Sequence, residues 1–129
     1  MPRGSGKSRS DPFAELAEGR LRPVYLVDGV PVLVDELVSA IRAAVFPPGA
    51  PGVDFNLEQL DGRSAALARV VDAAQTLPAF APRRLVVVRQ AELLIEKKSE
   101  DAVASLLGYF SNPSPTTVLV LVATSKLDA

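Results

Sequence analysis

The sequence contains no cysteine and no histidine among its 129 residues. Without these side chains the chain can form no disulfide, no Cys/His zinc site and no thiol nucleophile. It also has no imidazole for acid–base catalysis near neutral pH. The absence of cysteine fits a reducing compartment and does not by itself prove one, since secreted proteins can also lack it.

Long apolar runs and an excess of charge of one sign are also missing. The longest apolar run, Val118 to Ala123, is far too short to span a bilayer, and residues 1–7 lack the apolar core of a signal peptide. The formal net charge is −1, which gives no bulk attraction to DNA or to anionic lipid. We therefore expect a cytoplasmic protein without membrane contact, which would reach nucleic acid only through a local patch or a partner protein.

The composition favours one folded domain preceded by a tail. Hydrophobic residues make up 48% of the chain and charged residues 22%, and a chain of this length can bury about two-thirds of its unfolded surface. Residues 1–10 are mostly Gly, Ser, Lys and Arg, which cannot bury enough apolar area to offset their ordering entropy. We expect a disordered tail at 1–10 and a domain at 11–129.

Hydrophobic periodicity predicts alternating helices and strands through the domain. A first short helix begins at Pro12, with Ser10 or Asp11 as its cap, and ends at Gly19. Strands are predicted at residues 23–27, 54–60, 85–88 and 118–122. Longer helices are predicted at 31–46, at 64–75 with Ser64 as its cap, and at 93–110 with a possible break near Lys98 and Ser99.

Repeated strand–helix units imply right-handed crossovers and a parallel sheet. The runs at 85–88 and 118–122 are wholly apolar, as strands buried on both faces require, and 23–27 is interpreted in the same way. The fold class is therefore α/β, a three-layer α/β/α sandwich around a mainly parallel sheet. The inward residues are expected to be Leu33, Leu37, Ile41 and Val45 in one helix, Leu67, Val70, Val71 and Ala74 in another, and Phe55 and Leu57 on a strand.

In such folds a nucleotide usually binds at the loop after the first strand. A working phosphate loop needs several glycines, a lysine and a serine or threonine, because backbone N–H groups and the lysine hold the phosphates. Here the loop is Asp28, Gly29, Val30 and Pro31, with one glycine, no lysine, and a proline that removes an N–H donor. The fold is thus predicted to resemble a P-loop ATPase with a degenerate nucleotide site and no bound nucleotide.

Acids that could hold magnesium are also missing from the expected place. The third strand runs into Arg89, Gln90 and Ala91, and the first acid, Glu92, comes four residues after Val88. Residues 4–8 (GSGKS) resemble the end of a phosphate loop but follow no strand. Asp54, Glu58 and Asp61 are interpreted as solvated carboxylates. No catalytic residue, metal site or cofactor is therefore predicted.

The connection at residues 75–84 carries bulky apolar groups in a stretch that should run over the surface. Leu77 and Phe80 are flanked by Pro78 and Pro82, which stop helix and strand alike. One interpretation is that both side chains fold back as satellite core contacts. The other is that they are exposed anchors for a partner's pocket, stiffened by the two prolines.

An ordered set of segments resembles the N-terminal domain of the delta subunit of the bacterial DNA polymerase III clamp loader. These segments are 25–29 (YLVDG), 55–58 (FNLE), 60–63 (LDGR), 77–80 (LPAF), 83–88 (RRLVVV), 118–121 (VLVL) and 126–128 (KLD). The resemblance runs from about residue 13 to the end. It implies an AAA+-type fold that binds and opens the sliding clamp, the beta subunit, during DNA replication, without hydrolysing ATP itself.

The resemblance also implies partners and contact residues. The other loader subunits, gamma/tau and delta prime, would assemble with this one, DNA would be reached through the complex, and the family's lid and collar domains lie outside this chain. The family's clamp contact, a Gln followed by hydrophobic residues and a Phe, corresponds to Gln75, Leu77, Ala79 and Phe80. The family usually has a large residue at the position of Ala79, and burying a Leu contributes about 1.5–3 kcal/mol, so this departure predicts a weaker contact.

Three other function classes are disfavoured by the sequence. An ATP-dependent enzyme would need the missing phosphate loop and acids. A phosphorylated receiver-like domain would need acids clustered at strand ends, and Asp28 is the only acid directly at the end of an apolar strand. A DNA-binding module would be more basic. The remaining alternative is a degenerate nucleotide-binding-type domain that serves as a general protein-interaction or regulatory module.

Overall fold

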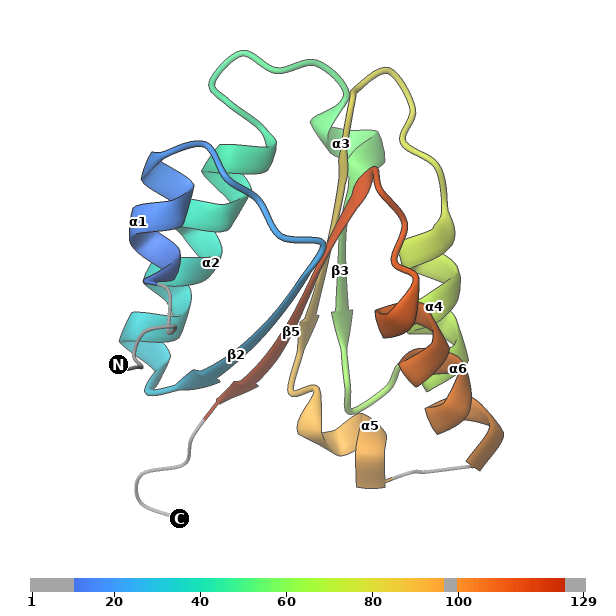
Figure 1. The fold of residues 1–129 in the computed structure, drawn as a ribbon. Helices are drawn as coiled ribbons and strands as arrows, with labels where there is room; N and C mark the ends of the chain where they lie inside the picture. The colour runs from blue at the N-terminus through green and yellow to red at the C-terminus, as the bar shows by residue number, and fades with distance from the viewer. Residues whose placement is uncertain (1–10, 97–99, 125–129) are drawn as a thin grey trace, which may run out of the picture.

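The computed structural model describes residues 11–96 and 100–124. The predicted tail at 1–10, the possible helix break at Lys98 and Ser99, and the segment 126–128 lie outside the described residues. Within them, α-helices and β-strands alternate along the chain as the periodicity predicted (Figure 1).

One sheet of four parallel strands forms the centre of the fold, in the order β2-β5-β4-β3. The strands are β2 (Val24–Gly29), β3 (Leu57–Asp61), β4 (Arg84–Arg89) and β5 (Thr117–Thr124). The two central strands, β4 and β5, are the wholly apolar runs of the sequence, because their side chains on both faces are covered. The prediction of a parallel sheet is confirmed.

Helices cover both faces of this sheet (Figure 1). On one face lie α1 (Pro12–Ala17) and α2 (Pro31–Val45), and on the other α4 (Leu67–Gln75), α5 (Glu92–Glu96) and α6 (Glu100–Ser111). The short helix α3 (Val53–Asn56) leads directly into β3. The three-layer α/β/α sandwich is therefore confirmed.

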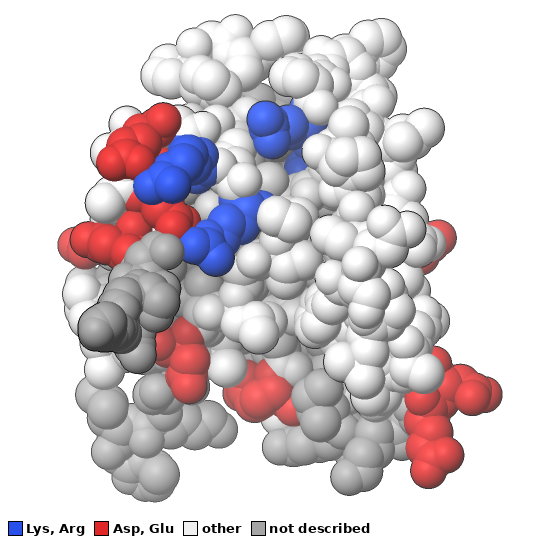
Figure 2. Space-filling view, viewed as in Figure 1, with Lys and Arg blue, Asp and Glu red and all other residues white. Residues whose placement is uncertain are grey.

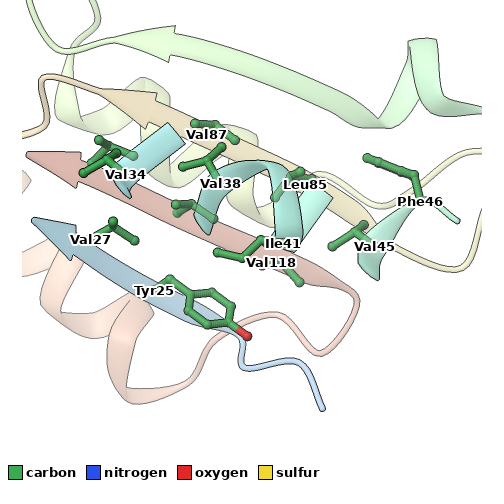
Figure 3. Packing of buried hydrophobic residues seen from close by; sticks show 12 residues of the cluster. Tyr25, Val27, Val34, Val38, Ile41, Val45, Phe46, Leu85, Val87 and Val118 are labelled. Atoms are coloured by element: carbon green, nitrogen blue, oxygen red, sulfur yellow. The ribbon is translucent and has the colours of Figure 1, made fainter. Parts of the chain in front are cut away.

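The core consists of two clusters, one on each face, because successive strand side chains point to opposite sides. Leu85 and Val87 of β4 pack with the α2 face, whereas Val86 and Val88 pack with the α4 and α6 face. On the α2 face, Val34, Val38, Ile41 and Val45 lie over Tyr25, Val27, Leu85, Val87 and Val118 (Figure 3). The predicted inward residues of α4, Leu67, Val70, Val71 and Ala74, are all buried.

The first helix follows its sequence signals. Asp11 is the N-cap, with its carboxylate accepting a hydrogen bond from the Phe13 N–H at 3.0 Å, and Pro12 occupies the first turn. Gly19, two residues after the helix, has φ +81°, a left-handed conformation that favours glycine.

Predictions of burial are wrong for three residues, Leu26, Leu33 and Phe55, of which Phe55 is 67% exposed. Leu26, predicted in a strand buried on both faces, is 72% exposed, because β2 is an edge strand and helices cover only one of its faces. Leu33 is also exposed, and Val34 and Val38 are the residues of α2 that face the core. Leu37 is partly buried against the core, and Ile41 and Val45 are buried as predicted.

Two element boundaries also differ from prediction. Residues 53–56 form helix α3 instead of the start of a strand, so Phe55 does not lie on a strand face. Helix α4 begins at Leu67 with Ala66 as its N-cap, and no side chain caps it, so the prediction that Ser64 is the cap is wrong. Ser64 lies in the turn after β3, where its N–H donates to the Asp61 carbonyl at 3.0 Å.

Candidate functional site

The strongest candidate site is the anchor segment, which we define as residues 75–80 between α4 and β4. Gln75 is the last residue of α4 and is exposed, as is Ala79. Leu77 is 76% exposed and Phe80 is 80% exposed. The interpretation that both side chains return to the core is therefore wrong, since they project from the surface. The structure brings all four sequence-predicted contact residues together on one short segment.

Helix α3 adds an aromatic ring to this surface. Phe55 is 67% exposed, and its ring lies 5.8 Å from that of Phe80 between centroids, with an interplanar angle of 62°. This edge-to-face arrangement is one that aromatic pairs prefer. In Figure 1 the anchor segment is the yellow loop beside α3, and the upper part of this face in Figure 2 is largely uncharged. Leu77, Phe80 and Phe55 thus form an exposed apolar patch.

The backbone of the anchor segment is held by one buried side chain. Asn56 is fully buried, and its amide nitrogen donates to the carbonyl of Ala79 at 2.5 Å and to that of Gly52 at 2.7 Å. Its amide oxygen accepts from the Ala79 N–H at 2.7 Å. Both backbone polar groups of Ala79 are thus satisfied by a single residue 23 positions earlier in the chain.

Buried Arg84 holds the elements around the anchor segment. Its guanidinium donates to the Ala73 carbonyl at 2.9 Å, to the Phe55 carbonyl at 3.2 Å, and to the carboxylate of Glu58. Glu58 is also paired with Arg69 of α4. The prediction that Glu58 is simply solvated is wrong, because this carboxylate lies between two arginines. These bonds join α3, α4, β3 and β4 beneath the exposed patch.

The degenerate loop lies at the carboxyl end of β2, where a nucleotide site would be expected. Asp28 and Gly29 end the strand, Val30 is the N-cap of α2, and Pro31 is its first residue. The N–H groups of Leu33 and Val34 both donate to the Val30 carbonyl, at 3.1 and 3.0 Å. Pro31 has no N–H and these two donors are used within the helix, so these three positions offer no backbone donor to a phosphate.

The neighbouring strand end carries a basic residue where magnesium-binding acids would be needed. Arg89, the last residue of β4, donates to the carboxylate of Asp35 in α2 at 2.9 Å. Over residues 11–96 and 100–124, no group of three or more acids could hold a metal ion. The end of β4 thus carries an ion pair where ATPases of this kind have magnesium-holding acids.

A hollow of about 320 Å³ lies on the other side of β2. Its walls are mostly apolar and come from β2, β5, α5 and α6, including Leu26, Leu94, Leu106 and Phe110. Asp28 and Glu92 are its two charged lining residues, and both are acidic. Such walls suit apolar atoms and would repel a triphosphate.

No helix among the described parts of the chain is long and apolar enough to cross a bilayer.

Sequence reasoning missed Gly52, Phe55 and Asn56 as members of this site. The sequence predicts a strand at Phe55 and Asn56, whereas Asn56 bonds Ala79 and Phe55 contacts Phe80, and such long-range contacts leave no local pattern. Gly52 is the one local signal, since a glycine marks a turn before α3, where its φ is +79°, but it does not indicate the role of Asn56.

Comparison with known proteins gives consistent similarities. The family model described as DNA polymerase III, delta subunit, matches residues 27–129. The DNA polymerase III subunit delta of Bacillus subtilis is 37% identical over 124 residues, which cover 92% of this chain and 35% of that protein. The chain therefore spans about a third of the length of this relative.

Solved structures agree with this similarity. The Bacillus subtilis DNA clamp loader delta protein superposes with a TM-score of 0.73 at 33% identity, covering 91% of this chain and 36% of that one. A DNA polymerase III gamma subunit-related protein from Thermotoga maritima superposes with a TM-score of 0.57 at 20% identity, covering 88% and 40%. The second likeness concerns the fold alone.

Proposed function

Because this chain belongs to the DNA polymerase III delta subunit family, we propose that residues 11–129 form the AAA+-like N-terminal domain of a clamp-loader subunit. In this proposal the domain binds the sliding clamp and helps to open its ring during DNA replication. The observation that carries the proposal is the exposure of Leu77 and Phe80 on a rigidly held segment.

In the proposed contact, side chains of the anchor segment insert into the clamp. Leu77 and Phe80 enter an apolar pocket of the clamp, and Gln75 donates or accepts a hydrogen bond at its rim. Aromatic side chains that are exposed in the free protein and buried in the complex commonly supply most of the binding energy. Ala79 offers less apolar area than a larger residue would, which places more of the affinity on Phe80.

Ring opening follows from a difference in affinity. A protein that binds the open clamp more tightly than the closed clamp shifts the equilibrium of the ring toward the open state. The free energy of this shift cannot exceed the difference between the two binding free energies. The domain needs no bound nucleotide for this role, in keeping with the degenerate loop at Asp28–Pro31 and the absence of acids at the end of β4. ATP hydrolysis would be carried out by other loader subunits.

The partners and location follow from the same proposal. The protein works in the cytoplasm, assembled with the gamma/tau and delta prime subunits, and it meets DNA through the assembled loader. The net charge of −1 supports this indirect route, since a domain so close to neutral has little attraction for the phosphate backbone on its own.

Titration of the full-length protein against the sliding clamp of the same organism tests the proposal, by calorimetry or surface plasmon resonance. We expect saturable binding that Phe80→Ala weakens by at least about thirtyfold, as for a central anchor residue. Phe13→Ala is the matched control, because Phe13 is also an exposed phenylalanine but lies in α1, which packs against α2. No binding by folded wild-type protein, or equal binding by Phe80→Ala, would contradict the proposal.

A further inference from the structure

Phe80 is held in a backbone conformation that its side chain disfavours. Its φ is +65°, in the left-handed region, where a bulky side chain is strained. Such a conformation persists only where surrounding contacts determine it. The ring itself cannot supply them through the core, because it is 80% exposed.

The determining contacts come from α3. Asn56 bonds both the N–H and the carbonyl of Ala79, the residue immediately before Phe80, so one group of the peptide before Ala79 and one group of the peptide after it are held. Phe55, the neighbour of Asn56 in sequence, places its ring edge-to-face against Phe80. The carbonyl of Phe55 is in turn fixed by Arg84. One short helix thus holds both the backbone and the ring.

We propose that α3 is the positioning element of the clamp contact: Asn56 sets the shape of the anchor segment before binding, and Phe55 supports the Phe80 ring and extends the apolar contact surface. The inference rests on the proposed clamp-binding function and deepens it. A segment that already has its bound conformation loses little conformational entropy on docking. A flexible segment binds only through the fraction of molecules that have this conformation, which lowers the apparent affinity.

The substitution Asn56→Ala tests the positioning role in the full-length protein. We expect clamp affinity to fall about tenfold, because the competent fraction of the anchor segment falls. Asn56→Asp should lower the clamp affinity by a similar factor, since a carboxylate keeps the volume of the side chain but cannot donate hydrogen bonds to the carbonyls of Gly52 and Ala79. Asn112→Ala, an exposed asparagine at the end of α6, is the matched control and should bind as wild type does.

A double-mutant cycle separates positioning from a general effect on the fold. If Asn56 acts through Phe80, the double variant Asn56→Ala/Phe80→Ala should bind no more weakly than Phe80→Ala alone. Additive losses would overturn the inference. Phe55→Ala should weaken binding several-fold, and its effect should likewise shrink in the Phe80→Ala background.

Hydrogen exchange provides a readout that does not depend on the clamp. The Ala79 amide should be protected in the wild-type protein and in Phe80→Ala, and should exchange rapidly in Asn56→Ala. Loss of this protection with unchanged clamp affinity would overturn the positioning role and leave the proposed function intact. Absence of clamp binding by wild-type protein would overturn the proposed function, and the positioning role with it.

Discussion

At the scale of single residues, Gly52 lies directly against the backbone of the anchor segment. A Cβ at this position would lie 3.0 Å from the carbonyl oxygen of Ala79 and 3.1 Å from that of Phe80. Gly49 has nearly the same backbone conformation, with φ +82° against +79°, but a Cβ there would have no neighbour within 4 Å. The two glycines therefore share the cost of a positive φ and differ in crowding.

We expect Gly52→Ala to lower the free energy of unfolding more than Gly49→Ala does. Both substitutions lose about 1 kcal/mol because alanine disfavours positive φ, and only Gly52→Ala must also push the backbone of Ala79 and Phe80 outward. Urea denaturation measures both variants, and clamp titration should show weaker binding for Gly52→Ala alone. Equal decreases in the free energy of unfolding for the two variants would mean that the anchor segment shifts to make room for the added Cβ without lowering stability.

Residue positions were predicted well where the pattern is local and poorly where tertiary contacts decide. Helical spacing correctly predicted that Ile41 and Val45 are buried, but it predicted Leu33 as buried instead of Val34. Apolar residues lie on more than one side of this helix, so only its packing decides which side faces the core. The exposure of Phe80 could be argued from its proline-rich surroundings. The role of Asn56 could not, since an asparagine bonded to a distant backbone leaves no mark in the sequence around it.

At the scale of secondary-structure elements, Arg84 joins four of them at one buried point. Its guanidinium bonds the carbonyl of Ala73 at the end of α4, the carbonyl of Phe55 in α3, and the carboxylate of Glu58 in β3. Methionine has a similar apolar stem but no donors, so Arg84→Met would remove all three bonds, although Glu58 would keep Arg69 and the Ala73 carbonyl would keep the Thr76 N–H. Arg83 is the adjacent arginine and is exposed.

We expect Arg84→Met to reduce the free energy of unfolding by about 2–4 kcal/mol, the range for removing a buried, hydrogen-bonded charge. Arg83→Met makes the same chemical change one residue away and should stay within about 0.5 kcal/mol of wild type. Urea denaturation at neutral pH compares the two. Similar small changes in both variants would show that water replaces the lost bonds.

The elements themselves were predicted with one main error, the assignment of residues 54–60 to a strand. Alternating apolar residues at Phe55 and Leu57 suit a strand, but the chain forms α3 first and pairs with β4 only from Leu57. A helix of four residues is too short for a helical period to show in the sequence. Its existence depends on Asn56 and on the left-handed turn at Gly52, both of which are tertiary features.

At the scale of the whole molecule, the parallel sheet was predictable but the order of its strands was not. Apolar strands alternating with amphipathic helices require crossovers and covered faces, which fixes three layers. No local pattern shows that β5 lies between β2 and β4, since that arrangement pairs Val24 with Leu119, 95 positions later in the chain. The consequence for function is that β2 and its following loop lie at one edge, and the anchor segment lies at the opposite end of the strands (Figure 1).

This arrangement predicts that the fold has kept the architecture of an ATPase while its nucleotide site is inactive. We expect millimolar ATP with magnesium to leave the midpoint of thermal unfolding of the full-length protein unchanged. A ligand present at 100 times its dissociation constant would stabilise the folded state by about 2.7 kcal/mol, a shift that calorimetry detects readily. The physical reason is that Pro31 lacks an N–H, Leu33 and Val34 donate within α2, and Arg89 at the end of β4 pairs with Asp35.

Tripolyphosphate with magnesium is the control that separates phosphate binding from nucleotide recognition. If both compounds raise the midpoint equally, the site is a simple anion site at the start of α2. If ATP alone raises it in a concentration-dependent way, the loop at Asp28–Pro31 binds nucleotide by contacts to the base and sugar, and the inactive-site interpretation is wrong. If neither ATP nor tripolyphosphate shifts the midpoint, the proposed ring opening by this domain would depend on its affinity for the clamp alone. The Phe80 and Asn56 variants would then measure the whole contribution of the domain to the proposed ring opening.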